Sequence, residues 1–109
     1  MSEKYIMVLT TTSSEEEAQE ISERLIKQGL AACVQTYGPI KSTYLWEGEI
    51  NRSEEWMCFM KTKKDVYDSL ENKIKEIHSY ETPEIVAIPI LAGNKDYLEW
   101  IDENVNMRS

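Results

Sequence analysis

The stretch His78-Ser79-Tyr80-Glu81-Thr82-Pro83-Glu84 separates a helical pattern from a strand pattern. The apolar residues before it recur at a spacing that predicts an amphipathic helix, at Val66, Leu70, Ile74 and Ile77. The residues directly after it, 85–90, form an apolar run that is typical of a strand. His78 therefore closes a helix and Glu84 opens a strand, and we place the functional site at this junction.

The first third of the chain shows the same succession of strand and helix patterns. Residues 5–9 are apolar and predict a buried strand. Ser14 and the three glutamates after it predict the start of a helix, because a hydroxyl caps the first turn and carboxylates there favour the helix dipole. Gly29 predicts the end of that helix. Residues 30–34 should form the first part of a second strand, which continues to residue 46 after an interruption at Gly38-Pro39.

The remaining patterns complete the order of elements. A turn begins at Glu47-Gly48, and the apolar residues 56–60 predict a third strand. Pro89 cannot donate a backbone hydrogen bond, so the strand over 85–90 should have a free edge or a bulge. Gly93-Asn94 should cap a short third helix, whose apolar residues are Tyr97, Leu98, Ile101 and Val105.

This order predicts a ferredoxin-like βαββαβ sandwich of the α+β class, followed by an added C-terminal helix. A single domain over residues 1–109 should contain a four-stranded antiparallel sheet with two helices on one face. Residues 56–60 and 85–90 are apolar toward both faces, yet these helices can cover only one. A large exposed apolar patch usually marks an interface, so we predict an oligomer that packs sheet to sheet. The alternative is that the third helix folds over the open face.

Composition excludes several partners. The chain has 20 acidic and 12 basic residues, a net charge of −8, which argues against nucleic acid and against an anionic membrane surface. Its apolar stretches are too short for a membrane-spanning helix or a signal peptide. The two cysteines are too few for a disulfide framework, so we expect a reducing, cytoplasmic location.

His78 is the only histidine and the first candidate ligand for a metal. Tyr80, Glu81 and Glu84 lie nearby in the sequence and offer oxygen ligands or supporting hydrogen bonds. The structural alternative is equally strong, because the helix dipole alone favours a histidine in the last turn of a helix.

Cys33 and Cys58 are candidate thiolate ligands, although free cysteines are often buried as small apolar residues. A turn near residues 48–52 would pair Cys58 with Lys41 and place Cys33 about 26 Å away along the strand. The two thiols of one subunit should therefore not share a metal.

Lys61 ends the apolar strand and either holds an anionic ligand or pairs with a glutamate such as Glu47 or Glu84. Trp46 belongs to an interface, a core or the wall of a pocket. The sequence contains no phosphate-binding loop, nucleophile elbow or zinc-protease motif, so we expect neither catalysis nor an organic cofactor.

Several ordered motifs resemble one known family over about residues 6–104. They are Gly29-Leu30-Ala31-Ala32-Cys33-Val34, Tyr44-Leu45-Trp46-Glu47-Gly48, Met60-Lys61-Thr62, His78-Ser79-Tyr80-Glu81-Thr82-Pro83-Glu84 and Asp96-Tyr97-Leu98-Glu99-Trp100-Ile101. With these motifs the chain resembles the CutA family, the divalent-cation tolerance proteins. The resemblance implies a ferredoxin-like homotrimer similar in architecture to PII signalling proteins, with a link to copper and other divalent cations. It also implies an intersubunit cleft lined by Cys33, Trp46, Glu47, Lys61, His78, Tyr80 and Glu84.

The chain departs from the family pattern at three positions. Ser79 stands where the family often has proline. Some members carry a cysteine after the first strand and two adjacent histidines, and the matching residues here are Thr10, Ile77 and His78. A metal site that used all three positions would keep only His78.

These observations lead to one hypothesis and two alternatives. The hypothesis is a non-enzymatic homotrimer that binds copper or another divalent metal at intersubunit clefts, with His78, Cys33 and Glu84 as ligands and Trp46, Glu47, Lys61 and Tyr80 lining the cleft. The first alternative is a PII-like sensor that binds a small anion or metabolite and reports to an unknown protein partner. The second is a trimeric scaffold without a ligand.

Overall fold

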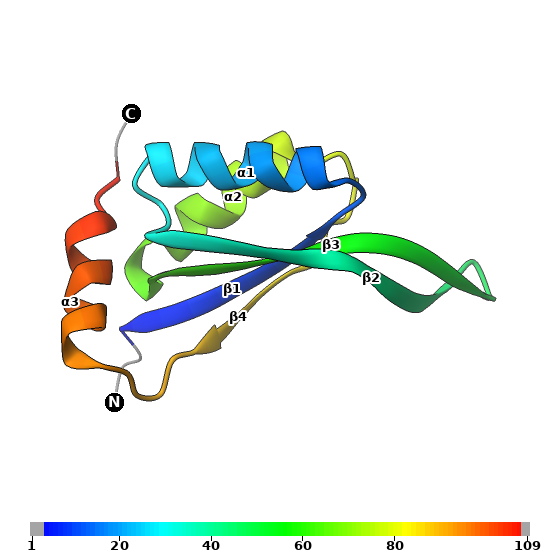
Figure 1. The fold of residues 1–109 in the computed structure, drawn as a ribbon. Helices are drawn as coiled ribbons and strands as arrows, with labels where there is room; N and C mark the ends of the chain where they lie inside the picture. Colours follow the sequence, from blue (N-terminus) through cyan, green and yellow to red (C-terminus); the bar gives the residue numbers. More distant parts are fainter. Residues whose placement is uncertain (1–3, 108–109) are drawn as a thin grey trace.

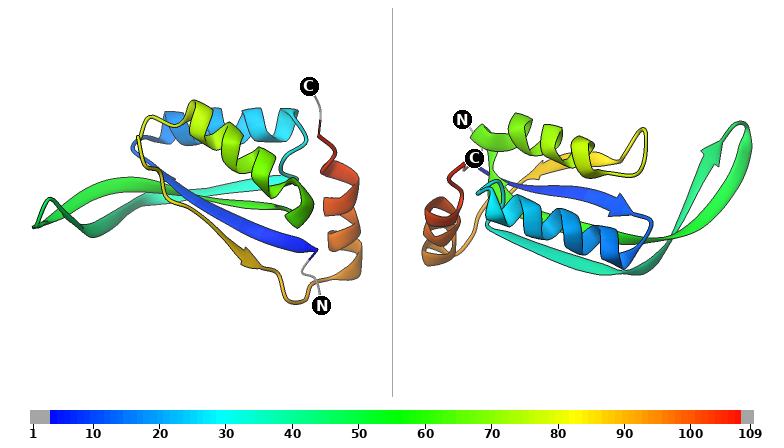
Figure 2. Two further views of the ribbon diagram at one scale, coloured as in Figure 1. Left: turned by 180° about the vertical axis from the view of Figure 1, so that it is seen from behind. Right: turned by 90° about the horizontal axis from the view of Figure 1, so that it is seen from above.

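The computed structural model describes residues 4–107 and has the element order predicted from the sequence. Its elements are β1 Tyr5–Thr12, α1 Glu15–Lys27, β2 Cys33–Trp46, β3 Glu49–Lys63, the 3-10 turn η1 Lys64–Val66, α2 Tyr67–Ile77, β4 Ile85–Pro89 and α3 Lys95–Asn104. The four strands pair antiparallel in the order β2-β3-β1-β4, which is the ferredoxin-like arrangement. Helices α1 and α2 lie side by side on one face of the sheet, as predicted (Figures 1 and 2).

The helix ends form as the local sequence predicts. The Ser14 side chain accepts a hydrogen bond from the Glu17 backbone N–H and caps α1. Gly29 follows the last turn of α1 with φ of +71°, a conformation that glycine adopts without steric cost. The Asn94 side chain caps α3 in the same way as Ser14 caps α1. Pro89 lies in β4, an edge strand, where its missing N–H leaves no gap inside the sheet.

The core lies between the sheet and helices α1 and α2. Alternate residues of the central strands face the helices and are fully buried or nearly so, and they are Ile6, Val8 and Thr10 of β1 and Cys58, Met60 and Thr62 of β3. Ile21 and Leu25 of α1 and Leu70 and Ile74 of α2 pack on them. Helix α3 closes one end of the sheet, where Ile101 packs with Ala32 and Val105 (Figure 1).

The other face of the sheet stays open and apolar. Strand β4 presents Val86 and Ile88 there, 47% and 45% exposed, and they pair with Leu9 and Met7 of β1. Helix α3 lies at the end of the sheet and does not fold across this face (Figure 2). The open face is therefore the apolar patch that the sequence predicts.

Strands β2 and β3 extend beyond the sheet as a two-stranded hairpin arm, residues 40–55 (Figure 1). The strands are joined at Glu47 and Gly48, whose φ values of 52° and 81° belong to a tight two-residue hairpin turn. This turn, with a register shift between Tyr37 and Ile40, sets a register different from the expected one. Cys58 pairs with Thr36 and not with Lys41.

The conformation of Gly29 generates the first prediction. A Cβ at Gly29 would lie 1.8 Å from the Asn106 carbonyl oxygen, whereas a Cβ at Gly48, with φ of +81°, would meet nothing within 4 Å. Gly48→Ala should cost about 1 kcal/mol from backbone conformation alone, and Gly29→Ala about 2–5 kcal/mol because the clash adds to it. Urea unfolding at one fixed protein concentration measures both, and equal losses would contradict the predicted clash.

Thr10 generates a second prediction. Its hydroxyl is buried and has no hydrogen-bond partner among the residues that the structure describes, whereas the equally buried Thr62 hydroxyl donates to the Leu30 carbonyl at 2.7 Å. Thr10→Val should therefore stabilise the protein by about 1 kcal/mol, and Thr62→Val should destabilise it by about 1 kcal/mol. Thermal unfolding of the two variants tests this, and a destabilised Thr10→Val protein would show that the hydroxyl has a partner.

Candidate functional site

His78 ends α2 and its side chain is completely buried, with 0% of its surface exposed. Its Nε2 lies 2.7 Å from the Thr11 carbonyl oxygen, and since a carbonyl only accepts, Nε2 carries the proton and donates. Its Nδ1 accepts a hydrogen bond from the Tyr80 backbone N–H at 3.1 Å. Both ring nitrogens are therefore engaged with backbone groups.

Glu17, from the first turn of α1, holds Ser79, the residue between His78 and Tyr80. Its carboxylate accepts hydrogen bonds from the Ser79 N–H at 2.7 Å and the Ser79 hydroxyl at 3.1 Å, and it lies 3.6 Å from His78 Nδ1. Burial raises the pKa of Glu17, but the hydrogen bonds from Ser79 outweigh burial and hold the net pKa below its usual value. The ionised carboxylate is thus the form that the fold favours.

Tyr80 connects this loop to the hairpin. Its hydroxyl donates to the Glu55 carboxylate at 2.7 Å, and its ring lies 4.8 Å from the His78 ring, centroid to centroid. Burial, and then the hydrogen bond to Glu55, raises the pKa of Tyr80 well above its ordinary value. Tyr80 therefore stays protonated and acts as a donor at neutral pH.

Lys61 and Cys33 face each other across β3 and β2, on the open face of the sheet. The Lys61 ammonium donates to the Gln35 side-chain carbonyl at 2.7 Å and lies 5.7 Å from the centre of the Tyr97 ring. Cys33 is half-buried, whereas Cys58 is completely buried on the helix side, where burial raises the pKa of its thiol.

The observed register corrects the expected distance between the two thiols. Cys58 is opposite Thr36, so Cys33 lies three strand residues away, about 10 Å along the strand, and not about 26 Å. An odd offset places the two side chains on opposite faces of the sheet. The sheet itself separates the two thiols of one subunit, so they cannot bind the same metal ion.

The remaining predicted site residues, Trp46, Glu47 and Glu84, lie apart from the Cys33–Lys61 pair. Trp46, 62% exposed, and Glu47 are at the tip of the hairpin arm (Figure 1). Glu84 is exposed just before β4, whose first residue pairs with Thr10, so it lies at the same end of the sheet as His78 and Tyr80. The seven predicted residues thus occupy three places on one chain: the His78 end of the sheet, the Cys33–Lys61 pair and the hairpin tip.

One subunit does not assemble a metal site from these residues. Within residues 4–107, no group of three or more His, Cys, Asp or Glu side chains could hold a metal ion. The predicted set of His78, Cys33 and Glu84 is divided between two of the three places, and both His78 nitrogens already have partners. The described residues of a single chain therefore do not fit a metal, and His78, Cys33 and Glu84 as ligands stay a prediction.

Sequence patterns missed Glu17 and Glu55, the two carboxylates that hold the loop. Glu17 has the pattern of a residue placed for the helix dipole, and Glu55 precedes the third predicted strand. Their partners, Ser79 and Tyr80, are 62 and 25 residues away. The only sequence signal was an acidic residue next to each apolar pattern, which is too common to indicate a site.

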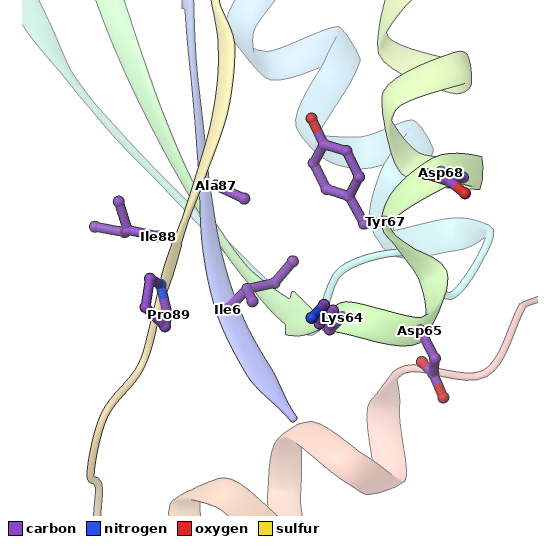
Figure 3. Close-up of a pocket in the computed structure, with 8 residues that line it drawn as sticks. All are labelled: Ile6, Lys64, Asp65, Tyr67, Asp68, Ala87, Ile88 and Pro89. Carbon is purple, nitrogen blue, oxygen red and sulfur yellow. The ribbon is translucent and has the colours of Figure 1, made fainter. Parts of the chain in front are cut away.

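A cavity of about 470 Å³ opens between the edge strand β4 and the start of α2 (Figure 3). Ile6, Ala87 and Pro89 form its apolar side, and Tyr67 forms the wall on α2, where burial raises its pKa to about 12. None of the seven predicted site residues lines it. The nearby Asp65 and Asp68 stand at the start of α2, where the helix dipole accounts for carboxylates.

None of the helices within residues 4–107 has the length and apolar character that crossing a membrane requires.

The lowered pKa of Glu17 predicts a pH dependence. Because folding favours the carboxylate, its contribution to stability is complete above the usual pKa of 4.5 and is lost as pH falls below that value. Glu17→Gln should therefore lower the melting temperature at neutral pH and make its fall on acidification shallower. Melting curves between about pH 7 and pH 3 measure this. Glu16→Gln, at an exposed position of the same turn, should keep the steep fall, and an equally steep fall in Glu17→Gln would contradict the assignment.

The sequence of residues 6–104 matches the family described as CutA1 divalent ion tolerance protein. The divalent-cation tolerance protein CutA of Thermus thermophilus is 41% identical over 98 residues, which cover 90% of this chain and 95% of that protein. The protein of the same name from Archaeoglobus fulgidus is 44% identical over 98 residues, again 90% and 95% of the two chains.

Solved structures agree with the sequence match. The divalent cation tolerance protein of Thermus thermophilus superposes with a TM-score of 0.92 at 39% identity, covering 94% of this chain and 99% of that chain. The structure described as the periplasmic divalent cation tolerance protein CutA of Archaeoglobus fulgidus gives a TM-score of 0.91 at 42% identity, with coverage of 94% and 99%. Sequence motifs, sheet topology and these similarities together show that the chain belongs to the CutA family of divalent-cation tolerance proteins.

Proposed function

We propose that this chain is a homotrimeric divalent-cation tolerance protein that binds copper or another divalent metal at the clefts between its subunits. The observation that carries the proposal is the division of the seven candidate residues among three places on one chain. The hairpin arm, residues 40–55, carries Trp46 and Glu47 far beyond the sheet (Figure 1). A neighbouring copy that packs on the open apolar face would bring its arm to the other residues.

The groups that suit a metal in this arrangement are a thiol and carboxylates. Cys33 is half-buried on the open face, and Glu84 and Glu47 are exposed, so each is accessible from a second copy. A thiolate is a soft ligand and favours a soft metal such as copper, whereas carboxylates favour harder cations. A bond to His78 would require one of the two hydrogen bonds of its ring to be given up.

We further propose that the protein catalyses no reaction and acts in the cytoplasm. The chain carries no sequence motif of a nucleophile or a phosphate-binding loop, and Tyr80, with its raised pKa, is held as a donor. The two cysteines point to opposite sides of the sheet, which is an arrangement suited to free thiols in a reducing compartment.

Native mass spectrometry of the metal-free protein, titrated with copper, tests the proposed function. We expect a trimer that takes up whole numbers of copper ions. Cys33→Ser should reduce the uptake, because it removes the accessible thiol. Cys58→Ser is the matched control and should leave the uptake unchanged, since that thiol is buried on the helix side. A monomer, or a trimer that stays free of copper, would contradict the proposal.

The PII-like sensor is the second candidate function, and the position of Lys61 favours it. Within residues 4–107 no carboxylate pairs with the Lys61 ammonium, which contacts only a neutral amide and an aromatic ring. Such an ammonium can bind a small anion. In the PII-like alternative, Tyr80 and Glu84 would contribute to the choice of that anion.

This alternative has its own test. A small anionic metabolite that binds at Lys61 should raise the melting temperature in proportion to the logarithm of its concentration once the site is saturated. Lys61→Ala should remove that stabilisation, whereas Lys64→Ala, at an exposed lysine outside the open face, should retain it. Stabilisation that persists in Lys61→Ala would exclude this site.

A further inference from the structure

The surroundings of His78 bear directly on which groups can bind the metal. A metal-ligating imidazole presents an unprotonated nitrogen whose lone pair is available. In His78 the proton on Nε2 is used by the Thr11 carbonyl, and the lone pair of Nδ1 is used by the Tyr80 N–H. The ring is also completely buried, so a metal would have to displace a backbone group to reach either nitrogen.

We infer that His78 is a positioning residue that fixes the loop before β4, and that the metal of the proposed function is held by the other groups. The imidazole connects the end of β1, through Thr11, to the backbone of Tyr80. It thereby sets where the Tyr80 side chain leaves the loop, and the Tyr80 hydroxyl reaches Glu55 on β3.

Each of three successive residues in this loop is held by a different element. His78 is bonded to β1, Ser79 to Glu17 on α1, and Tyr80 to Glu55 on β3. The loop is therefore formed before a ligand arrives, which lowers the entropy lost on binding. A histidine serves here because a neutral imidazole offers one donor and one acceptor on opposite sides of a rigid ring.

This inference rests on the proposed function only in assigning the metal to Cys33, Glu84 and Glu47. The assignment of the ring itself rests on two hydrogen bonds of 2.7 and 3.1 Å and on complete burial. This role agrees with the finding that, among residues 4–107, His78 does not belong to a group of three or more His, Cys, Asp or Glu side chains that could hold a metal.

Nitrogen-15 NMR of the histidine ring tests the inference, and the assignment is unambiguous because the chain has one histidine. In the metal-free protein we expect the proton on Nε2 and none on Nδ1. Zinc, a diamagnetic divalent probe, should leave both ring nitrogens unchanged while native mass spectrometry shows that the trimer takes it up. A proton on Nδ1, or a zinc-dependent shift of either nitrogen that is typical of coordination, would overturn the inference.

A failure of the proposed function would be seen in metal uptake and not in the metal-free NMR spectrum. If the trimer takes up neither zinc nor copper, the metal-binding proposal fails. The metal-free spectrum still decides the role of His78, because the expected protonation pattern supports the positioning role and the opposite pattern excludes it.

Two substitutions separate positioning from ligation. His78→Gln supplies an amide donor and acceptor that can replace both hydrogen bonds, so it should keep metal uptake and the environment of Tyr80. His78→Leu supplies neither and should release Tyr80, seen as a fall of its raised phenol pKa in ultraviolet titration. Loss of metal uptake in a folded His78→Gln trimer with its Tyr80 environment intact would assign His78 as a ligand.

Discussion

The central strands of the sheet are apolar on both faces, and the chain supplies helices for only one of them. Alternation along β1 sends Ile6 and Val8 to the helices and Met7 and Leu9 to the opposite side. Helix α3 packs at one end of the sheet, where it contacts Tyr5, and leaves Val86 and Ile88 of β4 exposed on the open face. Burial of that face is worth about 25 cal/mol per Å² of apolar surface, so it strongly favours association. The proposed trimer rests on this constraint.

A second constraint acts at the end of α2, where the chain must turn back into β4. Three groups from different elements hold residues 78–80: the Thr11 backbone carbonyl of β1 and the largely buried carboxylates of Glu17 on α1 and Glu55 on β3. Hydrogen bonds to charged groups contribute about 1.5–3 kcal/mol each, more than those between neutral groups. The loop therefore remains fixed without a ligand, although it has no regular secondary structure.

Local chemistry was predictable from the sequence, and pairing at a distance was not. Ser14, Gly29 and Asn94 mark the helix ends as expected, because a cap depends only on residues within one turn. The register of the hairpin was predicted wrongly, because it depends on which two residues form the turn, Glu47 and Gly48, and on the register shift between Tyr37 and Ile40. His78 and Tyr80 were expected to lie together because they are two residues apart in the sequence, and their rings are in contact. Glu17 and Glu55 were missed because their partners come from elsewhere in the fold.

The residue types that metals prefer are also those that satisfy buried backbone groups. Imidazole and carboxylate groups occur in both roles, so residue type alone does not distinguish a ligand from a support. A metal ligand is distinguished from a supporting residue by whether the lone pairs of its donor atoms are already used in hydrogen bonds. At His78 and Glu17 the accepting atoms already bind backbone N–H groups, whereas Cys33 and Glu84 face outward. A net charge of −8 attracts cations to the whole surface, so only donor atoms that the fold leaves unused can make one place on it selective.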